Sequence, residues 1–213
     1  HLVRVMRLRE GDGCVLFNGD GQDYSATLVV VGKRDAQVRI EAATALDNES
    51  PLHITLLQGI ARGEKMDLIL QKATELGVAK IQPMVTRRCV ADKLNAERAA
   101  TIVTEAAEQC ARTALPQVAD PVKLEALLRD WPADRALFFA DETGGEPAAA
   151  QFTAHQGPAA LLVGPEGGFD EEERAMVRAH PMARAITLGP RILRGETASI
   201  GATALWMAVS GDW

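Results

Sequence analysis

The sequence has few of the residues that build disulfide frameworks or metal sites. Its 213 residues include three cysteines and four histidines, and these are scattered singly rather than grouped at ligand spacing. A structural zinc site needs paired ligands a few residues apart, and a disulfide-rich domain needs a dense, even set of cysteines. We therefore expect a protein of a reducing compartment that uses no metal ion.

Long hydrophobic runs are also lacking. No apolar stretch approaches the roughly 18 residues that a membrane-spanning helix requires. The opening segment HLVRVMRLRE has no continuous apolar stretch of the kind found in a signal peptide. Since the sequence does not begin with Met, we expect part of an N-terminal domain to precede it. These features predict a cytoplasmic location.

Positive charge is in short supply overall. The 29 acidic and 23 basic residues give a formal net charge of −6, which provides no general attraction for nucleic acid. Phosphate binding nevertheless needs only a local basic face. Basic residues gather near the start of the chain and in predicted loops, although ordinary solvated surface would explain each one singly: Arg4, Arg7, Arg9, Arg62, Lys65, Arg87, Arg88 and Lys93.

The chain changes character near residue 50. Residues 1–47 contain three short apolar runs, VLF, ATLVVV and AQVRI, separated by Gly-Asp and Asn-Gly turn signals. This pattern is typical of β-hairpins. The polar segment DNESP at residues 47–51 is predicted to be a linker. We expect a small β-domain over 1–47, followed by a second domain over 52–213.

Strands and helices alternate in the second part, which predicts an α/β domain with a mostly parallel sheet. The predicted strands cover 52–60, 79–85, 135–140, 159–164 and 183–189, and the predicted helices cover 65–76, 96–112, 122–131, 170–179 and 196–209. A capping box from Asp170 to Glu173 begins the fourth helix. Residues 141–158 are predicted to be a loose loop. The last helix carries an apolar stripe of Ile200, Ala204, Met207 and Ala208.

Two of the predicted strands end in Gly-Pro. One runs into Gly164-Pro165-Glu166-Gly167-Gly168-Phe169 and the other into Gly189-Pro190-Arg191. Open parallel sheets bind ligands at the carboxyl ends of their strands, and glycine lets the backbone approach a ligand closely. One Gly-Pro alone could be only a tight turn, but the pair predicts a shared pocket.

The acidic residues near the first loop bear on the ligand. The loop has neither the GxGxxG pattern nor the Walker lysine of nucleotide-binding proteins. Glu166 and the acids from Asp170 to Glu173 are expected to repel a pyrophosphate at the helix start. S-adenosylmethionine, with its sulfonium and its zwitterionic amino acid, fits such a site better than NAD or ATP.

The segment LGPRILRGETASIG, at residues 188–201, carries the candidate catalytic residues. Arg191 and Arg194 could hold a phosphate, a carboxylate or a base carbonyl oxygen. Four roles are open for Glu196: capping the last helix, pairing with an arginine, accepting a hydrogen bond from a ligand amine, or taking a proton.

The sequence resembles the bacterial 16S ribosomal RNA uridine-N3 methyltransferase family, which belongs to the SPOUT class of knotted methyltransferases. The matching stretches are HLVRVMRLREGD, SPLHITLLQGIARGEKMDLILQKATELGV, EAAEQCAR followed by Pro116, LLVGPEGGF and LGPRILRGETA. They cover nearly the whole chain in order. Gly195 departs from the residue type expected in that last motif.

The resemblance implies a PUA-like barrel, incomplete at its N-terminus, and a SPOUT domain with a deep trefoil knot. It also implies a homodimer with S-adenosylmethionine bound in the knot, and an acceptor uridine of 16S ribosomal RNA in the assembled small subunit. The expected cofactor residues are Leu162, Gly164, Pro165, Glu166, Gly167, Gly168, Leu188, Gly189, Ile192, Leu193 and Thr197. The expected RNA contacts are Arg7, Arg62, Lys65, Arg87, Arg88 and Arg112.

Uridine N3 can accept a methyl group only after its proton leaves. An arginine, Arg191 or Arg194, is expected to stabilise the resulting anion, and Glu196 or water is expected to take the proton. Two other functions stay open: ribose 2′-O methylation by a related knotted enzyme, and RNA binding without catalysis.

Overall fold

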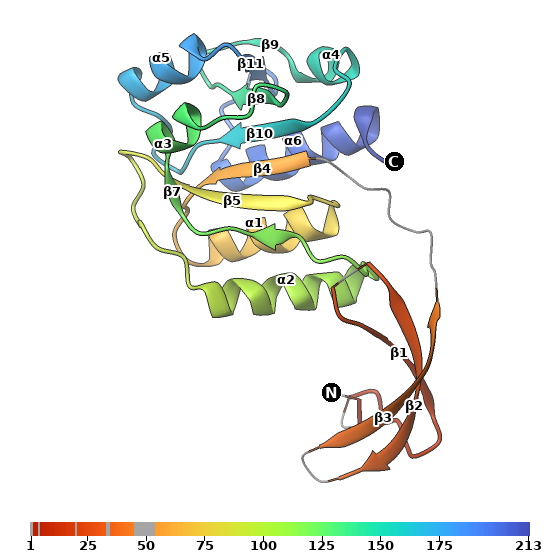
Figure 1. The fold of residues 1–213 in the computed structure, drawn as a ribbon. Helices are drawn as coiled ribbons and strands as arrows, with labels where there is room; N and C mark the ends of the chain where they lie inside the picture. Colours follow the sequence, from red (N-terminus) through yellow and green to blue (C-terminus); the bar gives the residue numbers. More distant parts are fainter. Residues whose placement is uncertain (1, 4, 20, 33–34, 45–53) are drawn as a thin grey trace. The chain divides into compact units, whose positions relative to one another are not determined.

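The computed structural model describes residues 2–3, 5–19, 21–32, 35–44 and 54–213. The chain has two compact units (Figure 1). One comprises His1–Ser50 together with Ala111–Leu115, and the other comprises Pro51–Cys110 and Pro116–Trp213. The predicted linker at 47–51 lies outside the described residues.

The N-terminal unit contains a three-stranded antiparallel sheet, which confirms the three predicted strands. The strands are β1 (Gly13–Phe17), β2 (Asp23–Val31) and β3 (Ala36–Thr44), in the order β1-β2-β3. Among the described residues of this sheet, the buried apolar ones are Ala26 and Leu28 of β2. A parallel bridge between Gly19 and Ala114 explains why residues 111–115, which lie beyond the predicted β-domain, join this unit.

The C-terminal unit is built on a parallel sheet, as predicted. Its order is β6-β5-β4-β10-β8-β11-β9, with β7 also beside β5. The strands are β4 (Ile54–Gly59), β5 (Lys80–Val85), β6 (Gln117–Val118), β7 (Val122–Lys123), β8 (Ala136–Ala140), β9 (Glu146–Pro147), β10 (Ala159–Val163) and β11 (Ala183–Thr187). In this order β4 pairs with β10, so the carboxyl end of β4 lies beside the first Gly-Pro loop.

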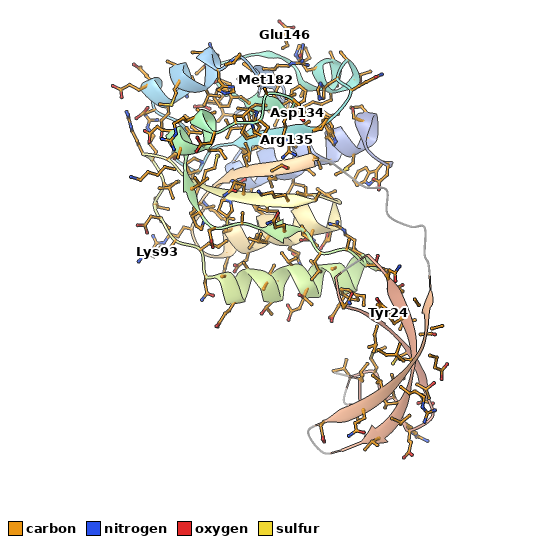
Figure 2. All side chains as sticks on the ribbon, viewed as in Figure 1. Tyr24, Lys93, Asp134, Arg135, Glu146 and Met182 are labelled. Atoms are coloured by element: carbon orange, nitrogen blue, oxygen red, sulfur yellow. The ribbon has the colours of Figure 1, made fainter. Side chains whose placement is uncertain are left out.

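Helices cover both faces of the sheet (Figure 1), and side chains fill the space between the layers (Figure 2). The helices are α1 (Glu64–Glu75), α2 (Ala96–Cys110), α3 (Leu124–Arg129), α4 (Ala148–Thr153), α5 (Glu171–Ala179) and α6 (Gly195–Ser210). Successive strand residues face opposite layers. Phe139 accordingly packs edge-on against Phe169 on one face, while Phe138 meets Phe152 of α4 and Trp206 of α6 on the other.

Two predictions about this unit were wrong in detail. Residues 141–158 are not a loose loop, because they contain β9 and α4, and the Phe152 ring is fully buried. The predicted helix at 122–131 begins only at Leu124, because Val122 and Lys123 pair with β5. The stripe on the last helix is divided: Met207 lies in the core, whereas Ala208 is exposed.

None of the helices in the described ranges combines the length and the apolarity needed to cross a bilayer. The trefoil knot stays a prediction.

Candidate functional site

The carboxyl ends of β8, β10 and β11 meet around a cavity of about 490 Å³. Pockets for small ligands commonly have volumes of a few hundred Å³. Three segments line it, namely residues 140–142 at the end of β8, 163–168 at the end of β10, and 186–195 at the end of β11, together with Lys65 and Ala198. Both Gly-Pro loops therefore reach one pocket.

Most of the expected cofactor residues line this cavity. They are Gly164, Pro165, Glu166, Gly167, Gly168, Leu188, Gly189, Ile192 and Leu193. Two others do not line it. Leu162 is fully buried in the core beneath the loop, and Thr197 is exposed on the first turn of α6.

The expected catalytic residues are separated by the fold. Arg191 and Arg194 line the cavity and are exposed, and neither makes an ion pair with any residue that the structure describes. Glu196 does not line it, and its buried Oε2 atom has no hydrogen-bond partner among the described residues. Its side chain neither caps α6 nor pairs with an arginine within the described part of the chain. The two arginines are therefore available to meet an anion or a polarised carbonyl at the rim.

Close backbone contacts hold the first loop, residues 164–168. A methyl group on Gly167 would lie 2.9 Å from the Cβ atom of Arg88, and one on Gly168 would lie 3.1 Å from Oε1 of Glu142. Gly168 also has a positive φ of 66°, which β-branched residues rarely adopt. A side chain at Gly167 would therefore displace Arg88, and one at Gly168 would be strained by its φ and would push Glu142 aside.

We expect Gly168→Val to abolish ligand binding in the cavity, because valine is strained at this φ and pushes Glu142 from its place in the cavity wall. Gly157→Val is the matched control, since Gly157 has a φ of 108° but a methyl group there would meet no atom within 4 Å. Isothermal titration calorimetry with S-adenosylmethionine measures the difference. Equal affinities for the two variants would contradict this account of the loop.

Glu166 anchors the same loop to the segment before α1. Its Oε1 atom accepts from the backbone N–H of Arg62 and from Nζ of Lys65, each at 3.2 Å. Partial burial raises the pKa of Glu166, but the hydrogen bonds from backbone N–H groups and from Lys65 outweigh this effect and hold it below its ordinary value. Lys65, expected to contact RNA, thus lines the cavity.

The acids at the start of α5 do not face the ligand, contrary to the sequence prediction. None of the residues from Asp170 to Glu173 lines the cavity. The predicted capping box is confirmed. Arg87 holds Asp170 at 3.1 Å and also pairs with Glu172, and its backbone N–H donates to Glu173. The backbone N–H of Glu173, followed by Arg87, lowers the pKa of Asp170. The acidity of the pocket comes instead from Asp141, Glu142 and Glu166.

Arg87 and Arg88, both expected to bind RNA, have structural partners. The Arg87 guanidinium lies among acids of α3 and α5, and Arg88 Nη1 donates to the Gly167 carbonyl at 3.2 Å. Reversing both charges would therefore disturb the cavity wall as well as any RNA contact. The other expected RNA contacts, Arg7, Arg62 and Arg112, do not line the cavity.

The loop after β8 was not predicted as part of the site. Asp141 has a fully buried side chain, and its Oδ2 atom accepts from Arg178 at 2.7 Å. Its Oδ1 atom accepts from Thr143 and lies 3.3 Å from Nε of Arg174. Arg174 in turn pairs with Glu142 at the cavity. One sequence feature could have indicated this loop: Asp141 is an acidic residue that directly follows the apolar strand β8.

Comparisons with known proteins agree with this geometry. A family model described as an RNA methyltransferase domain matches residues 48–207, and one described as an RNA methyltransferase PUA domain matches residues 1–41. Ribosomal RNA small subunit methyltransferase E of Rickettsia conorii is 31% identical over 96% of this chain and 84% of its own. The protein of that name from Bacillus subtilis is 33% identical over 94% of this chain and 83% of its own.

Solved structures match over nearly the full chain. Ribosomal RNA small subunit methyltransferase E of Neisseria gonorrhoeae, bound to S-adenosyl methionine, has a TM-score of 0.87 and 35% identity, covering 97% of this chain and 86% of that one. A methyltransferase structure from Legionella pneumophila in complex with SAM has a TM-score of 0.85 and 35% identity, covering 98% and 87%. The chain therefore belongs to the RNA methyltransferase family that includes ribosomal RNA small subunit methyltransferase E.

Proposed function

We propose that this protein transfers a methyl group from S-adenosylmethionine to N3 of a uridine in 16S ribosomal RNA. The observation that carries this proposal is the cavity formed by both Gly-Pro loops, with Arg191 and Arg194 at its rim. The two similar structures that contain the cofactor support the choice of ligand.

The lining of the cavity suits a zwitterionic, sulfonium-bearing ligand. Carboxylates of Glu142 and Glu166 can attract its positive groups, and Arg191 and Arg194 can attract its carboxylate. The glycine loops expose backbone N–H and C=O groups to a purine ring. The cofactor supplies an electrophilic methyl group when bound.

The protein's own residues must favour the uridine N3 anion. Arg191 or Arg194 stabilises charge spread over the two base carbonyl oxygens, because a guanidinium at the cavity rim can donate to both oxygens. Glu196, which follows Arg194 closely in the chain, is one proposed proton acceptor. Because its Oε2 atom is buried and Glu196 does not line the cavity, the proton would reach it through a water molecule. Water is the other acceptor.

Two measurements test the proposal. Isothermal titration calorimetry is expected to show S-adenosylmethionine binding far more tightly than NAD or ATP. Mass spectrometry of ribosomal RNA from cells with and without the protein is expected to show N3-methyluridine in the small-subunit RNA only when the protein is present. Tight NAD binding, or a methyl group on a ribose 2′ oxygen, would overturn the assignment.

Arg194→Ala is expected to lower kcat roughly 100-fold, because a preorganised charge at the reacting group is typically worth that much. RNA affinity is expected to change little. Arg98→Ala is the control, since Arg98 is exposed on α2 and pairs with Asp67 away from the cavity. Single-turnover kinetics with unmodified small subunits separates kcat from RNA binding. A loss confined to RNA affinity would rule out a catalytic role for Arg194.

The proposed partners are RNA in the assembled small subunit and a second copy of this chain, in the cytoplasm. Because the net charge is −6, binding needs several shaped contacts at once, which a structured subunit offers and a free strand does not. Candidate contacts are Arg7, Arg62 and Arg112. Methylation of a random uridine-containing oligonucleotide as fast as of whole subunits would contradict this account of specificity.

The dimer is expected to use α6, where Ile200 and Ala204 are half-buried and Ala208 is exposed in the single chain. Static light scattering at micromolar concentration should give twice the 22.8 kDa chain mass. A monomer that still methylates RNA would contradict the prediction that activity requires a dimer through α6.

A further inference from the structure

A buried glutamine lies where the two walls of the cavity approach each other. Gln58 is the penultimate residue of β4, and its side chain is fully buried. It does not line the cavity. No role was predicted for it from the sequence, although it lies in the stretch SPLHITLLQGIARGEKMDLILQKATELGV, and the proposed mechanism does not use it.

Every polar atom of the Gln58 side chain has a partner. Its Nε2 atom donates to the Gly59 carbonyl at 2.8 Å and to the Gly164 carbonyl at 3.3 Å. Its Oε1 atom accepts from the hydroxyl of Ser199, which is also buried. Since both neighbours of Nε2 are carbonyl oxygens, the orientation of the amide is determined by its surroundings.

These bonds join three parts of the fold near the cavity, namely the end of β4, the loop after β10 and the start of α6. Gly164 begins the loop after β10, and Ser199 lies on the first turns of α6, where its hydroxyl is also 2.9 Å from the Gly195 carbonyl. Gly195 itself approaches the first loop, since a methyl group there would lie 3.2 Å from the Gly164 oxygen. The Gln58 amide therefore lies at the junction of the 164–168 loop and the 186–195 segment.

We propose that Gln58 is a positioning residue for the cofactor: its amide fixes the Gly164 carbonyl relative to the start of α6, and so sets the distance between the two loops that hold the ligand. The inference rests on the proposed function only for the identity of that ligand. Positioning by a buried, fully paired amide is effective because each broken bond would leave a desolvated polar group without a partner.

The neighbouring strand supplies a matched control. Gln82 of β5 is also buried, and its Nε2 atom donates to the next carbonyl, that of Pro83, at 3.1 Å and to a loop carbonyl, that of Asp120, at 2.7 Å. The two glutamines thus make the same pair of bonds on adjacent strands. Gln82 does not line the cavity, and both of these bonds lead away from the cavity loops.

Gln58→Leu and Gln82→Leu are therefore compared. Both remove a buried amide, so both are expected to lower the melting temperature. Only Gln58→Leu is expected to weaken S-adenosylmethionine binding, by roughly tenfold or more, because the Gly164 carbonyl loses its donor at the cavity. Equal affinities in the two variants, or an unchanged affinity in Gln58→Leu, would overturn the proposal.

Gln58→Glu is expected to make cofactor affinity depend on pH, which a general loss of stability would not do. The ionised carboxylate faces two carbonyl oxygens and donates to neither, whereas the protonated acid can donate to one. Cofactor affinity of this variant is expected to be weak at about pH 8 and to recover toward about pH 6, since burial favours the protonated form. Wild type and Gln82→Glu should show no such recovery, and a flat profile for Gln58→Glu at wild-type affinity would refute the role.

A cofactor-free measurement keeps this inference distinct from the proposed function. Amide hydrogen exchange over residues 164–168 of the empty protein is expected to be faster in Gln58→Leu than in Gln82→Leu. If wild type does not bind S-adenosylmethionine but the exchange difference appears, the proposed function fails and the positioning role stands. If wild type binds it and the exchange rates are equal, the positioning role fails alone.

Discussion

Replacing Gly59 with alanine is expected to abolish cofactor binding and to destabilise the C-terminal unit. A methyl group at Gly59 would lie 2.4 Å from the backbone nitrogen of Pro165 and 2.9 Å from the carbonyl carbon of Gly164. These are backbone atoms of the cavity wall, so the collision cannot be relieved by a side-chain rotation. The loop must move as a whole.

The expected loss in affinity for S-adenosylmethionine is at least about 100-fold, or about 2.7 kcal/mol. Unfolding free energy is expected to fall by about 1–3 kcal/mol, the usual cost of overpacking a close contact. Gly13→Ala in β1 is the control, because the nearest atom to its methyl group would be 4.0 Å away. Calorimetric titration and urea denaturation measure both quantities. Wild-type affinity in Gly59→Ala would show that the loop is not held by this contact.

Removing the carboxylate of Asp141 is expected to produce the largest loss of stability. Asp141→Ala leaves Arg174 and Arg178 without their shared partner, while Thr143 loses the acceptor for both its N–H and its hydroxyl. Deleting one member of a buried ion pair typically costs about 3–5 kcal/mol. We expect about 3 kcal/mol here, since Arg178 is half-exposed and can recover water.

Asp130→Ala is the matched control for this prediction. Asp130 pairs with Arg129, but both side chains are more than 70% exposed, and such solvated pairs contribute little to stability. Urea denaturation at neutral pH compares the variants. Cofactor affinity should fall with Asp141→Ala too, because the same loop carries Glu142 at the cavity. A loss no larger than that of Asp130→Ala would show that the buried network contributes little.

The sequence predicted those features that depend on near neighbours in the chain. Apolar spacing predicted the five long strands and the helices other than α4, and the Asp170–Glu173 pair predicted the capping box, because each needs only a few consecutive residues. The two Gly-Pro loops were predicted to share a pocket, since parallel strands present their carboxyl ends at one edge.

Residue charges were harder to assign. The acids at the start of α5 and the basic pair Arg87 and Arg88 were both expected to face ligands, yet they neutralise each other or hold the loop. A charged residue in a predicted loop shows that a partner is needed, but it does not show whether that partner is a ligand or another side chain.

Taken alone, the sequence therefore determined most of the elements, their alternation and two of the three segments that line the cavity. Tertiary structure decided which strands are neighbours, and β4 lies beside β10 although about 100 residues separate them. That pairing brings Gln58 and Gly59 against Gly164. Strand order depends on packing between distant segments, and periodicity within a strand carries no information about which other strand will lie beside it.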